Sequence, residues 1–407
     1  MQAVIAIPES VAQTGEQTAR KLLMQKICGV PLLIRTQVTA ARAGANDIFL
    51  VFPEKFSTEF IQECTQGVLQ YGVRAEAVRV SDFDPQASSS WTRLNSELQD
   101  EFLWVPWNWV TNKQFLTSLP LVSKLSVDWK RPAYVSVHEV DRDVPQKSAE
   151  GVAVTSPQSA AAAERFLIAR SGKVLDGIHT SFNRRLCRPF VRLLSHTSIT
   201  PNQVTFAGVI VSVFSAIAFA QGAYIQSVLG AVIFFVAGLF DEVDGMLARV
   251  KFMESPLGTW LEGFADGLSY LLLFGGITIG LRRHYGKLAV VMGVALLVGA
   301  ILALIVTSVG RRRATSPDRP NEYLGRFYHL LEKDSANWIS RLVREVQAFQ
   351  KRGVMIHYVL IFTMIGALPL VFLLSTLGAH LTWILSLYFN RRFFAVRANV
   401  NTVTEAL

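Results

Sequence analysis

The 407-residue sequence contains only three cysteines, Cys28, Cys64 and Cys187, which lie far apart along the chain. Their spacing forms neither a disulfide framework nor a CxxC metal-binding pattern. We therefore expect three free thiols in a reducing compartment. The start of the chain also lacks the basic n-region and the small-residue cleavage site of a secretory signal peptide, because Met1 leads directly into an apolar segment.

Charged residues are scarce over long stretches of the second half of the chain. Residues 1–160 carry scattered charges and contain no uncharged run that could span a bilayer. A spanning helix needs about 20 apolar residues. The uncharged run Gln203–Phe240 is too long for one span and fits two, with a break near Gln221–Gln226.

Further apolar runs complete the predicted membrane region. A third span extends from near Gly258 to near Leu281, and a fourth covers Leu288–Gly310. The run Gly353–Phe389 is again of double length, with a break predicted at Gly366–Pro369. The sequence therefore predicts an all-α polytopic membrane domain with six transmembrane helices over residues 201–392, followed by a C-terminal tail at residues 393–407.

Basic residues predict the orientation of these spans. The segment 311–352 carries ten Lys and Arg against five Asp and Glu, and an Asn-Arg-Arg sequence follows the last span. Such flanks indicate the cytoplasmic side of a membrane. We expect a multi-pass protein of the cell (inner) membrane, with both termini and the acidic residues described below on the cytoplasmic side. The short basic loop Arg282–Lys287 is external in this scheme, against the same rule.

The linker at residues 156–200 contains a basic segment with apolar residues at helical spacing, Ala162–Leu194. This pattern predicts a basic amphipathic helix lying on an anionic membrane surface, with membrane lipids as its partners. A nucleic-acid patch is the rival interpretation. It is disfavoured because the segment leads directly through Thr197–Thr205 into the first span, so no nucleic-acid partner is expected.

Two pairs of acidic residues lie between apolar segments. Asp241 and Asp244 are three residues apart, so they share one face of a helix. Glu262 and Asp266 are four residues apart and share a face in the same way. Small residues beside the pairs would allow close approach of helices or of ligand phosphates; they are Gly245, Ala248 and Gly258.

Four carboxylates in one desolvated place would repel one another and take up protons. Divalent cations remove that repulsion, and Mg²⁺ and Mn²⁺ both prefer carboxylate oxygens and bind phosphates. Ionisable residues at membrane depth are functional by default. The alternative is that the acids form salt bridges with Arg249, Lys251 or other basic residues.

These residues resemble the motif of the CDP-alcohol phosphotransferase (CDP-alcohol phosphatidyltransferase) family, D-x2-D-G-x2-A-R-x8-G-x3-D-x3-D. The chain matches every spacing with Asp241, Asp244, Gly245, Ala248, Arg249, Gly258, Glu262 and Asp266. The resemblance extends over roughly residues 162–392. It implies a transferase of phospholipid or polyol-phosphate biosynthesis. Such an enzyme passes a substituted phosphoryl group from a CDP-linked donor to an alcohol or phosphorylated alcohol and releases CMP.

The resemblance also implies roles for the acidic residues. Two Mg²⁺ or Mn²⁺ ions would be bound by the carboxylates of Asp241, Asp244, Glu262 and Asp266. Asp266 would in addition act as general base on the acceptor hydroxyl. Glu262 departs from the family, which has Asp at this position; its side chain keeps the charge but reaches one methylene further.

Other roles implied by the resemblance concern the nucleotide and the acceptor. The nucleotide pocket would be formed by Asn202, Gly245, Ala248, Arg249, Ser255 and Gly258. An acceptor phosphate would be bound by Arg311, Arg312, Arg313 and Arg352. The alternative for these four arginines is simple anchoring at the cytoplasmic membrane surface.

The first 155 residues have a different pattern. Ala3–Ile7 is typical of a buried strand, and Gly29–Glu54 predicts a helix, a turn and a second buried strand, which together indicate an α/β domain. The layout resembles sugar-nucleotide-type nucleotidyltransferases, with matches at Lys21 and Gly29–Leu33. The expected Gly-rich loop is missing, because Pro8–Arg20 contains a single glycine, and Asn108 stands where a metal-binding carboxylate is expected. We interpret the domain as a degenerate relative.

Several alternatives stay open at this point. If the N-terminal domain is inactive, the donor comes from elsewhere, and CDP-diacylglycerol is then a candidate. The order of domains also resembles enzymes that use soluble CDP-inositol. The acceptor alcohol and a homodimeric state are undecided, and the alternative function is a non-catalytic membrane scaffold or binding protein derived from this family.

Overall fold

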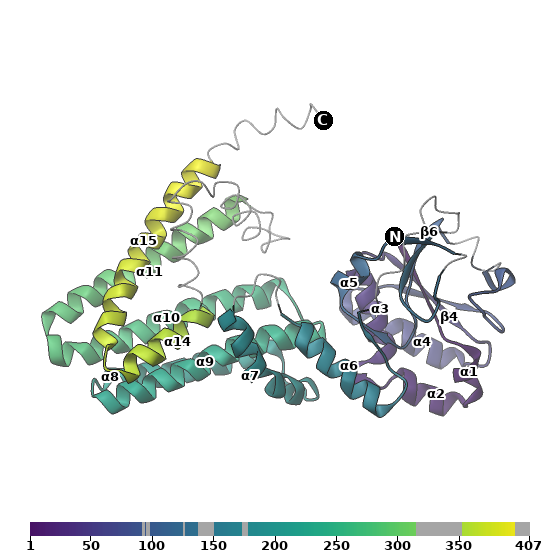
Figure 1. The fold of residues 1–407 in the computed structure, drawn as a ribbon, viewed down its shortest axis with the longest axis horizontal. Helices are drawn as coiled ribbons and strands as arrows, with labels where there is room; N and C mark the ends of the chain where they lie inside the picture. Colours follow the sequence, from purple (N-terminus) through teal and green to yellow (C-terminus); the bar gives the residue numbers. More distant parts are fainter. Residues whose placement is uncertain are drawn as a thin grey trace. The chain divides into compact units, whose positions relative to one another are not determined.

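The computed structural model of the chain describes residues 1–91, 94, 98–124, 127–136, 150–172, 178–314 and 352–394. The chain packs as two compact units (Figure 1). The first comprises Met1–Gly172, Arg188–Ser198 and Arg249–Phe252. The second comprises Lys173–Cys187, Ile199–Ala248 and Met253–Leu407.

The first unit is built on a six-stranded mixed sheet with the order β5-β4-β1-β6-β9-β8. Its strands are β1 (Gln2–Ala6), β4 (Asp47–Phe52), β5 (Ala75–Arg79), β6 (Glu101–Trp104), β8 (Leu121–Ser123) and β9 (Ala133–Ser136). β1 pairs in parallel with β4 and β6, whereas β9 runs antiparallel to β6. Every residue of β1 is buried, which confirms the predicted central strand and the α/β class.

Helices and short strands complete the first unit. The helices are α1 (Glu9–Gln13), α2 (Glu16–Leu23), α3 (Leu32–Arg42), α4 (Thr58–Gln66), α5 (Lys113–Thr117) and α6 (Pro157–Arg170), with 3-10 turns η1 (Leu69–Tyr71) and η2 (Ser88–Trp91). The two-residue strands are β2 (Lys26–Ile27), β3 (Val30–Pro31), β7 (Trp109–Val110) and β10 (Val152–Ala153). The predicted helix, turn and strand within 29–54 are confirmed as α3, a turn with Gly44 at φ +108°, and β4.

The position of the missing Gly-rich loop is occupied by helices. The segment that directly follows β1 folds as α1 and α2, and the amides of Val11, Thr14 and Ala19 are bonded within it. Asn108, which stands where a carboxylate is expected, donates from Nδ2 to the carbonyl oxygen of Val154 at 3.3 Å. Both features give these segments structural partners in place of ligands.

Glu164 on α6 is a buried acceptor that holds distant segments of the first unit together. Its carboxylate accepts a hydrogen bond from the Cys28 amide at 3.2 Å and lies 3.4 Å from Arg192 and 3.0 Å from His196. Residues 188–198 are thereby attached to the α/β layer. Cys28 itself is buried, and burial raises the pKa of its thiol to about 11. All three cysteines are free, as predicted, and the structure shows that they are also buried.

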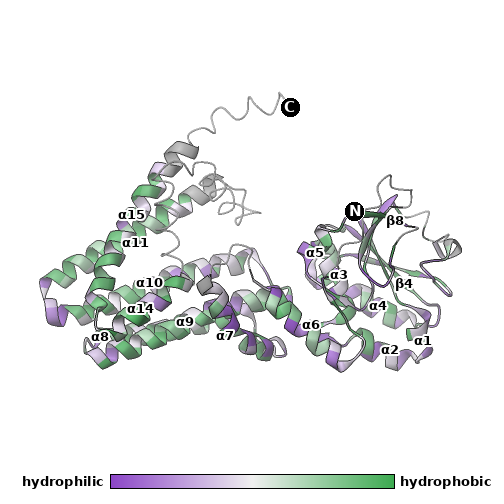
Figure 2. Ribbon diagram, viewed as in Figure 1, coloured by the Kyte–Doolittle hydropathy of each residue, from purple (hydrophilic) through white to green (hydrophobic). Residues whose placement is uncertain are grey.

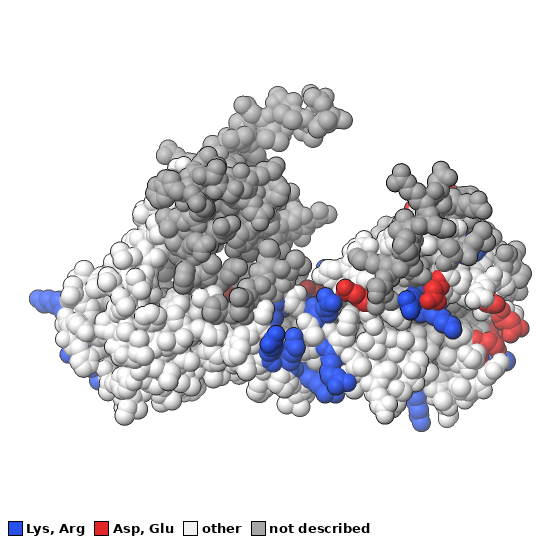
Figure 3. Space-filling view, viewed as in Figure 1, with Lys and Arg blue, Asp and Glu red and all other residues white. Residues whose placement is uncertain are grey.

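The second unit is helical, and its described residues include five helices long and apolar enough to cross a membrane (Figure 2). These are α8 (Pro201–Ala220), α9 (Tyr224–Lys251), α10 (Pro256–Tyr285), α11 (Lys287–Ala314) and α15 (Leu368–Phe394). On the face shown in Figure 3, these helices present a surface with few charged side chains. The predicted break near Gln221–Gln226 is confirmed between α8 and α9.

The prediction of six spans is not confirmed. The predicted break at Gly366–Pro369 exists, but the helix before it, α14 (Arg352–Met364), has only 13 described residues. At about 1.5 Å per residue such a helix is about 20 Å long, shorter than a hydrocarbon core of about 30 Å. Residues 315–351 lie outside the described part of the chain.

The predicted amphipathic helix at Ala162–Leu194 is wrong in its continuity. The structure has two helices there, α6 and α7 (Ile178–Ser195), because Ser171 and Gly172 end the first of them. α7 keeps the predicted amphipathic character. Its exposed apolar residues are Phe182, Leu186, Phe190 and Leu193, and its buried residues are Asn183, Arg184, Cys187, Val191 and Ser195.

The basic loop at the end of α10 caps a neighbouring helix. Arg283 donates from a guanidinium nitrogen to the carbonyl oxygen of Gln221 at 2.6 Å, and His284 Nε2 lies 2.8 Å from the carbonyl oxygen of Gly222. These carbonyl oxygens lie at the C-terminal end of α8 and have no partner within the helix. A basic side chain there donates hydrogen bonds to them and interacts favourably with the helix dipole. The loop therefore has a structural role that the positive-inside rule does not consider.

Glycines on α10 allow its backbone to touch α8. A Cβ atom added at Gly276 would lie 2.4 Å from the carbonyl oxygen of Ala216, whereas one added to the adjacent Gly275 would meet nothing within 4 Å. Small residues of this kind let membrane helices approach closely. This contact fixes the two helices that flank the acidic pair of α9.

Replacing Gly276 by Ala should therefore destabilise the helical unit, because the new methyl group forces α8 and α10 apart. Overpacking of this kind costs about 1–3 kcal/mol. Gly275→Ala is the matched control and should leave stability unchanged or slightly raised, since Ala is the better helix former. Thermal unfolding in detergent compares the two variants, and an equal melting temperature for both would contradict the close contact.

Candidate functional site

The first acidic pair lies on α9 at a pocket between three helices. The pocket is lined by Thr205, Gly208, Val209, Ala237, Asp241, Asp244, Ala265 and Ser269. Its walls are thus supplied by α8, α9 and α10. Asp244 is only 3% exposed, whereas Asp241 is half-buried.

Asp244 has one strong polar partner and one carboxylate oxygen without any. The hydroxyl of Thr205 on α8 donates to Asp244 Oδ2. Asp244 Oδ1 is buried and has no hydrogen-bond partner among the described residues. A buried charged oxygen in this state is costly unless a further ligand compensates it. The donor chemistry, hard carboxylate and hydroxyl oxygens, fits a divalent cation such as Mg²⁺.

The second acidic pair lies on α10. Glu262 and Asp266 are half-buried and one turn apart, on the helix that supplies Ala265 and Ser269 to the pocket. Asp244 interacts electrostatically with Asp241 and with Glu262. Within the described ranges no three acidic, His or Cys side chains gather closely enough to hold an ion. The four-carboxylate metal centre therefore stays a prediction.

Three of the residues predicted to contact a nucleotide gather at the start of α10. Ser255 is the N-cap of this helix, and its Oγ accepts the Gly258 amide at 3.0 Å. A Cβ atom added to Gly258 would lie 3.1 Å from Ser255 Oγ and 3.4 Å from Asn202 Oδ1. Gly258 therefore keeps space open beside two polar side chains. A helix start with free amides is suited to bind an anion.

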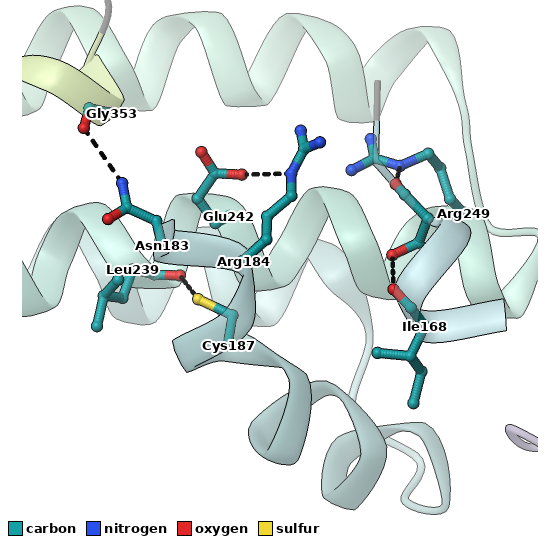
Figure 4. Close-up of polar contacts among 9 residues, drawn as sticks. Ile168, Asn183, Arg184, Cys187, Leu239, Glu242, Arg249 and Gly353 are labelled. Carbon is teal, nitrogen blue, oxygen red and sulfur yellow. Dashed lines mark hydrogen bonds and ion pairs between the residues drawn. The ribbon is translucent and has the colours of Figure 1, made fainter. Parts of the chain in front are cut away.

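The remaining predicted nucleotide residues follow Asp244 on α9. Gly245 and Ala248 are half-buried on the next turns of the helix. Arg249 donates from Nε to the carbonyl oxygen of Ser171, the C-cap of α6 (Figure 4). Lys251 donates to the carbonyl oxygen of Thr197 at 2.8 Å. Both basic side chains considered as salt-bridge partners thus bind backbone carbonyls within the first unit.

For the four residues predicted to bind the acceptor phosphate, the structure describes only the backbone. Arg311, Arg312 and Arg313 lie in the last turn of α11, and Arg352 is the first residue of α14. Their side chains lie outside the described part of the structure. Their role stays a prediction.

An ion pair beside the first acidic pair was missed from the sequence. Arg184 on α7 donates from Nε to Glu242 at 3.1 Å, and their side chains are only 10% and 13% exposed (Figure 4). Asn183 donates to the carbonyl oxygen of Gly353 at 3.2 Å, and the Cys187 thiol contacts that of Leu239. Glu242 is therefore neutralised by α7.

Thr205 was missed as well. It follows Asn202 by three residues and precedes Gly208 by three, so the three residues share one helical face. This spacing was a usable signal for a polar stripe on α8. Ser269, which follows Ala265 by four residues, marks the matching face of α10 and accepts a hydrogen bond from Ser212 Oγ at 3.1 Å.

The helical unit, with carboxylates in a pocket between apolar helices, defines a polytopic membrane protein with an acidic site. Residues 198–388 match the CDP-alcohol phosphatidyltransferase family. The resemblance predicted from the acidic motif is thus confirmed over this range.

Two curated relatives are similar to the chain. One is the bifunctional IPC transferase and DIPP synthase of Aquifex aeolicus, 23% identical over 237 residues that cover 58% of this chain and 49% of the relative. The other is the archaetidylinositol phosphate synthase of Pyrococcus horikoshii, 32% identical over 90 residues that cover 22% of this chain and 46% of the relative. The chain thus spans about half the length of the curated relatives it matches.

Replacing Thr205 by Val should destabilise the protein, because it removes the hydrogen bond to the buried Asp244 carboxylate while keeping the shape of the side chain. Hydrogen bonds to charged groups contribute about 1.5–3 kcal/mol. Thr205→Ser is the control, since it keeps the hydroxyl. Chemical or thermal unfolding in detergent gives the comparison, and a Val variant as stable as the Ser variant would show that the bond contributes nothing.

Proposed function

We propose that the chain is an integral membrane transferase. It moves a substituted phosphoryl group from a CDP-linked donor to an alcohol acceptor and releases CMP. The observation that supports this most is Asp244, a buried carboxylate with an unsatisfied oxygen in a pocket between α8, α9 and α10. It lies within the range that matches the CDP-alcohol phosphatidyltransferase family.

The residues of the chain would divide the work between binding and proton transfer. Asn202, Ser255 and Gly258 would bind the nucleotide at the start of α10. Asp266 would accept the proton of the acceptor hydroxyl as that oxygen attacks the donor phosphorus, and CMP would leave with the bridging oxygen. Two divalent ions, held by Asp241, Asp244, Glu262 and Asp266, would supply neutralisation of charge on the attacking and leaving oxygens.

The donor is proposed to be a lipid, CDP-diacylglycerol, with a soluble CDP-polyol as the second candidate. The reason is the first unit, in which helices α1 and α2 replace the Gly-rich loop and Asn108 binds a backbone carbonyl. Such a unit is not expected to make a CDP-alcohol from CTP. Phosphorylated inositol is the first acceptor to test, because one relative is named an archaetidylinositol phosphate synthase.

CMP release by the detergent-purified full chain tests the proposal. Each donor is combined with a panel of alcohols and phosphorylated alcohols in the presence of Mg²⁺ or Mn²⁺. We expect turnover that EDTA abolishes and that excess Mg²⁺ or Mn²⁺ restores, because four acidic residues sharing one site need cations. Undiminished turnover in excess chelator would refute the two-ion site, and no CMP from any pair would favour the scaffold alternative.

Substitutions of the individual carboxylates should impair different steps of the reaction. Asp266→Asn should retain much of the donor binding but lose turnover by about 10²–10⁴-fold or more, because general-base catalysis is removed together with a cation ligand. Asp241→Asn should instead weaken cation and donor binding together. Glu262→Asp, which restores the family residue, is the conservative comparison. CMP release is measured beside cation-dependent donor binding, and an Asp266→Asn variant as fast as the parent would exclude the base assignment.

A further inference from the structure

The turn that ends α9 has an unusual residue at its centre. Phe252 has φ +58°, a left-handed conformation that side chains with a Cβ adopt reluctantly. The Met253 amide bonds to the carbonyl oxygen of Ala248 at 2.8 Å, which is the hydrogen bond of a Schellman turn. Glycine is the usual residue at the left-handed position of such turns. A phenylalanine there needs a compensating interaction.

Cations surround the Phe252 ring within the first unit. The guanidinium carbon of Arg35 lies 4.9 Å from the ring centroid, and that of Arg42 lies 4.7 Å from it. Tyr71 contacts the ring edge-on, with the centroids 6.1 Å apart. Both arginines lie within the distance at which a cation is attracted to an aromatic face.

The same arginines also bind the carbonyls of the helix end. Arg35, on α3, is 1% exposed and donates to the carbonyl oxygens of Val250 at 2.8 Å and of Ile27 at 2.7 Å. Arg42 donates to the carbonyl oxygen of Phe252 at 3.1 Å. Burial lowers the pKa of Arg35 to about 10, so the side chain is still cationic at neutral pH. Cations at a helix C-terminus stabilise its dipole.

The contacts of Arg35 and Arg42 with the Phe252 ring and with the nearby carbonyls are called the Phe252 clamp below. Its position along the chain connects it with the acidic site. α9 carries Asp241 and Asp244 about three and about two turns before Phe252, respectively. Ser255, the cap of α10, follows Phe252 by three residues. The turn therefore joins the two helices that bear the acidic pairs. Its conformation sets where α9 ends and α10 begins.

We propose that Phe252 is a positioning residue whose clamp by Arg35 and Arg42 fixes the α9–α10 turn and thereby the affinity of the acidic site for a divalent cation. The role of the α/β unit would thus be to supply this clamp and not to catalyse a reaction itself. The inference rests on the proposed function, because it takes the acidic pairs as the cation ligands.

Three substitutions at Phe252 distinguish the effect of the aromatic ring from that of the left-handed backbone conformation. Phe252→Leu keeps an apolar side chain but removes the aromatic face, and Phe252→Tyr keeps the face. Phe252→Gly relieves the left-handed backbone while removing the ring, so it protects the test against a variant that fails to fold. Tyr285→Leu, at the exposed end of α10, is the matched aromatic control.

Two measurements on the full-length protein in detergent are independent of turnover. Hydrogen exchange reports protection of the amides at 250–255, and electron paramagnetic resonance with Mn²⁺ alone reports cation affinity. We expect Phe252→Leu and Phe252→Gly to lose protection and to bind Mn²⁺ about 10-fold more weakly, as is typical when support of cation ligands is removed. Phe252→Tyr and Tyr285→Leu should match the parent.

The outcomes distinguish this inference from the proposed function. Loss of protection with unchanged Mn²⁺ affinity would make the clamp merely structural and overturn the inference, as would Leu or Gly variants equal to the parent in both measurements. A parent that binds no Mn²⁺ would overturn it as well. A parent that binds Mn²⁺ but releases no CMP would instead refute the transferase proposal and leave the clamp to be judged by the two binding measurements.

Discussion

The desolvated carboxylate of Asp244 is the constraint on which the helical unit depends. An ionised side chain with so little exposed surface has a large energetic cost unless hydrogen bonds or opposite charges compensate it. α8 supplies the Thr205 hydroxyl. The neighbouring Glu242 has its own cation in Arg184, so its charge is already compensated. Neighbouring helices thus supply a polar partner to each of these two carboxylates of α9.

The α/β unit has a buried central strand that is followed by helices and not by a Gly-rich loop. Its central strands keep parallel order and a fully buried β1, which depend only on apolar residues. A phosphate-binding loop presents several free backbone amides, whereas this segment folds as helices α1 and α2, which leave amides free only in their first turns. Meanwhile α3 directs its arginines to carbonyls at the end of α9. Helix α3 of this unit thus supplies two cationic side chains to the C-terminal end of a helix.

Local patterns in the sequence predicted much of this architecture, whereas tertiary partners were beyond them. The β1 strand, the break after α8 and the acidic pairs all follow from periodicity, Gly residues and charge within a few positions. The count of six spans is not confirmed, because only 13 residues of α14 are described. Arg184 and Phe252 act through partners 58 and more than 200 residues away, which spacing along one chain cannot show.

The three thiols of the chain have a practical consequence. Cys28, Cys64 and Cys187 are all buried, and burial raises the pKa of Cys64 and of Cys187 to about 12 and that of Cys28 to about 11. Thiolates, the species that react with maleimides and spin labels, are therefore scarce at neutral pH. The three native cysteines should therefore react slowly with thiol-specific labels. A cysteine introduced at an exposed position would carry a probe selectively, with the wild-type thiols left in place.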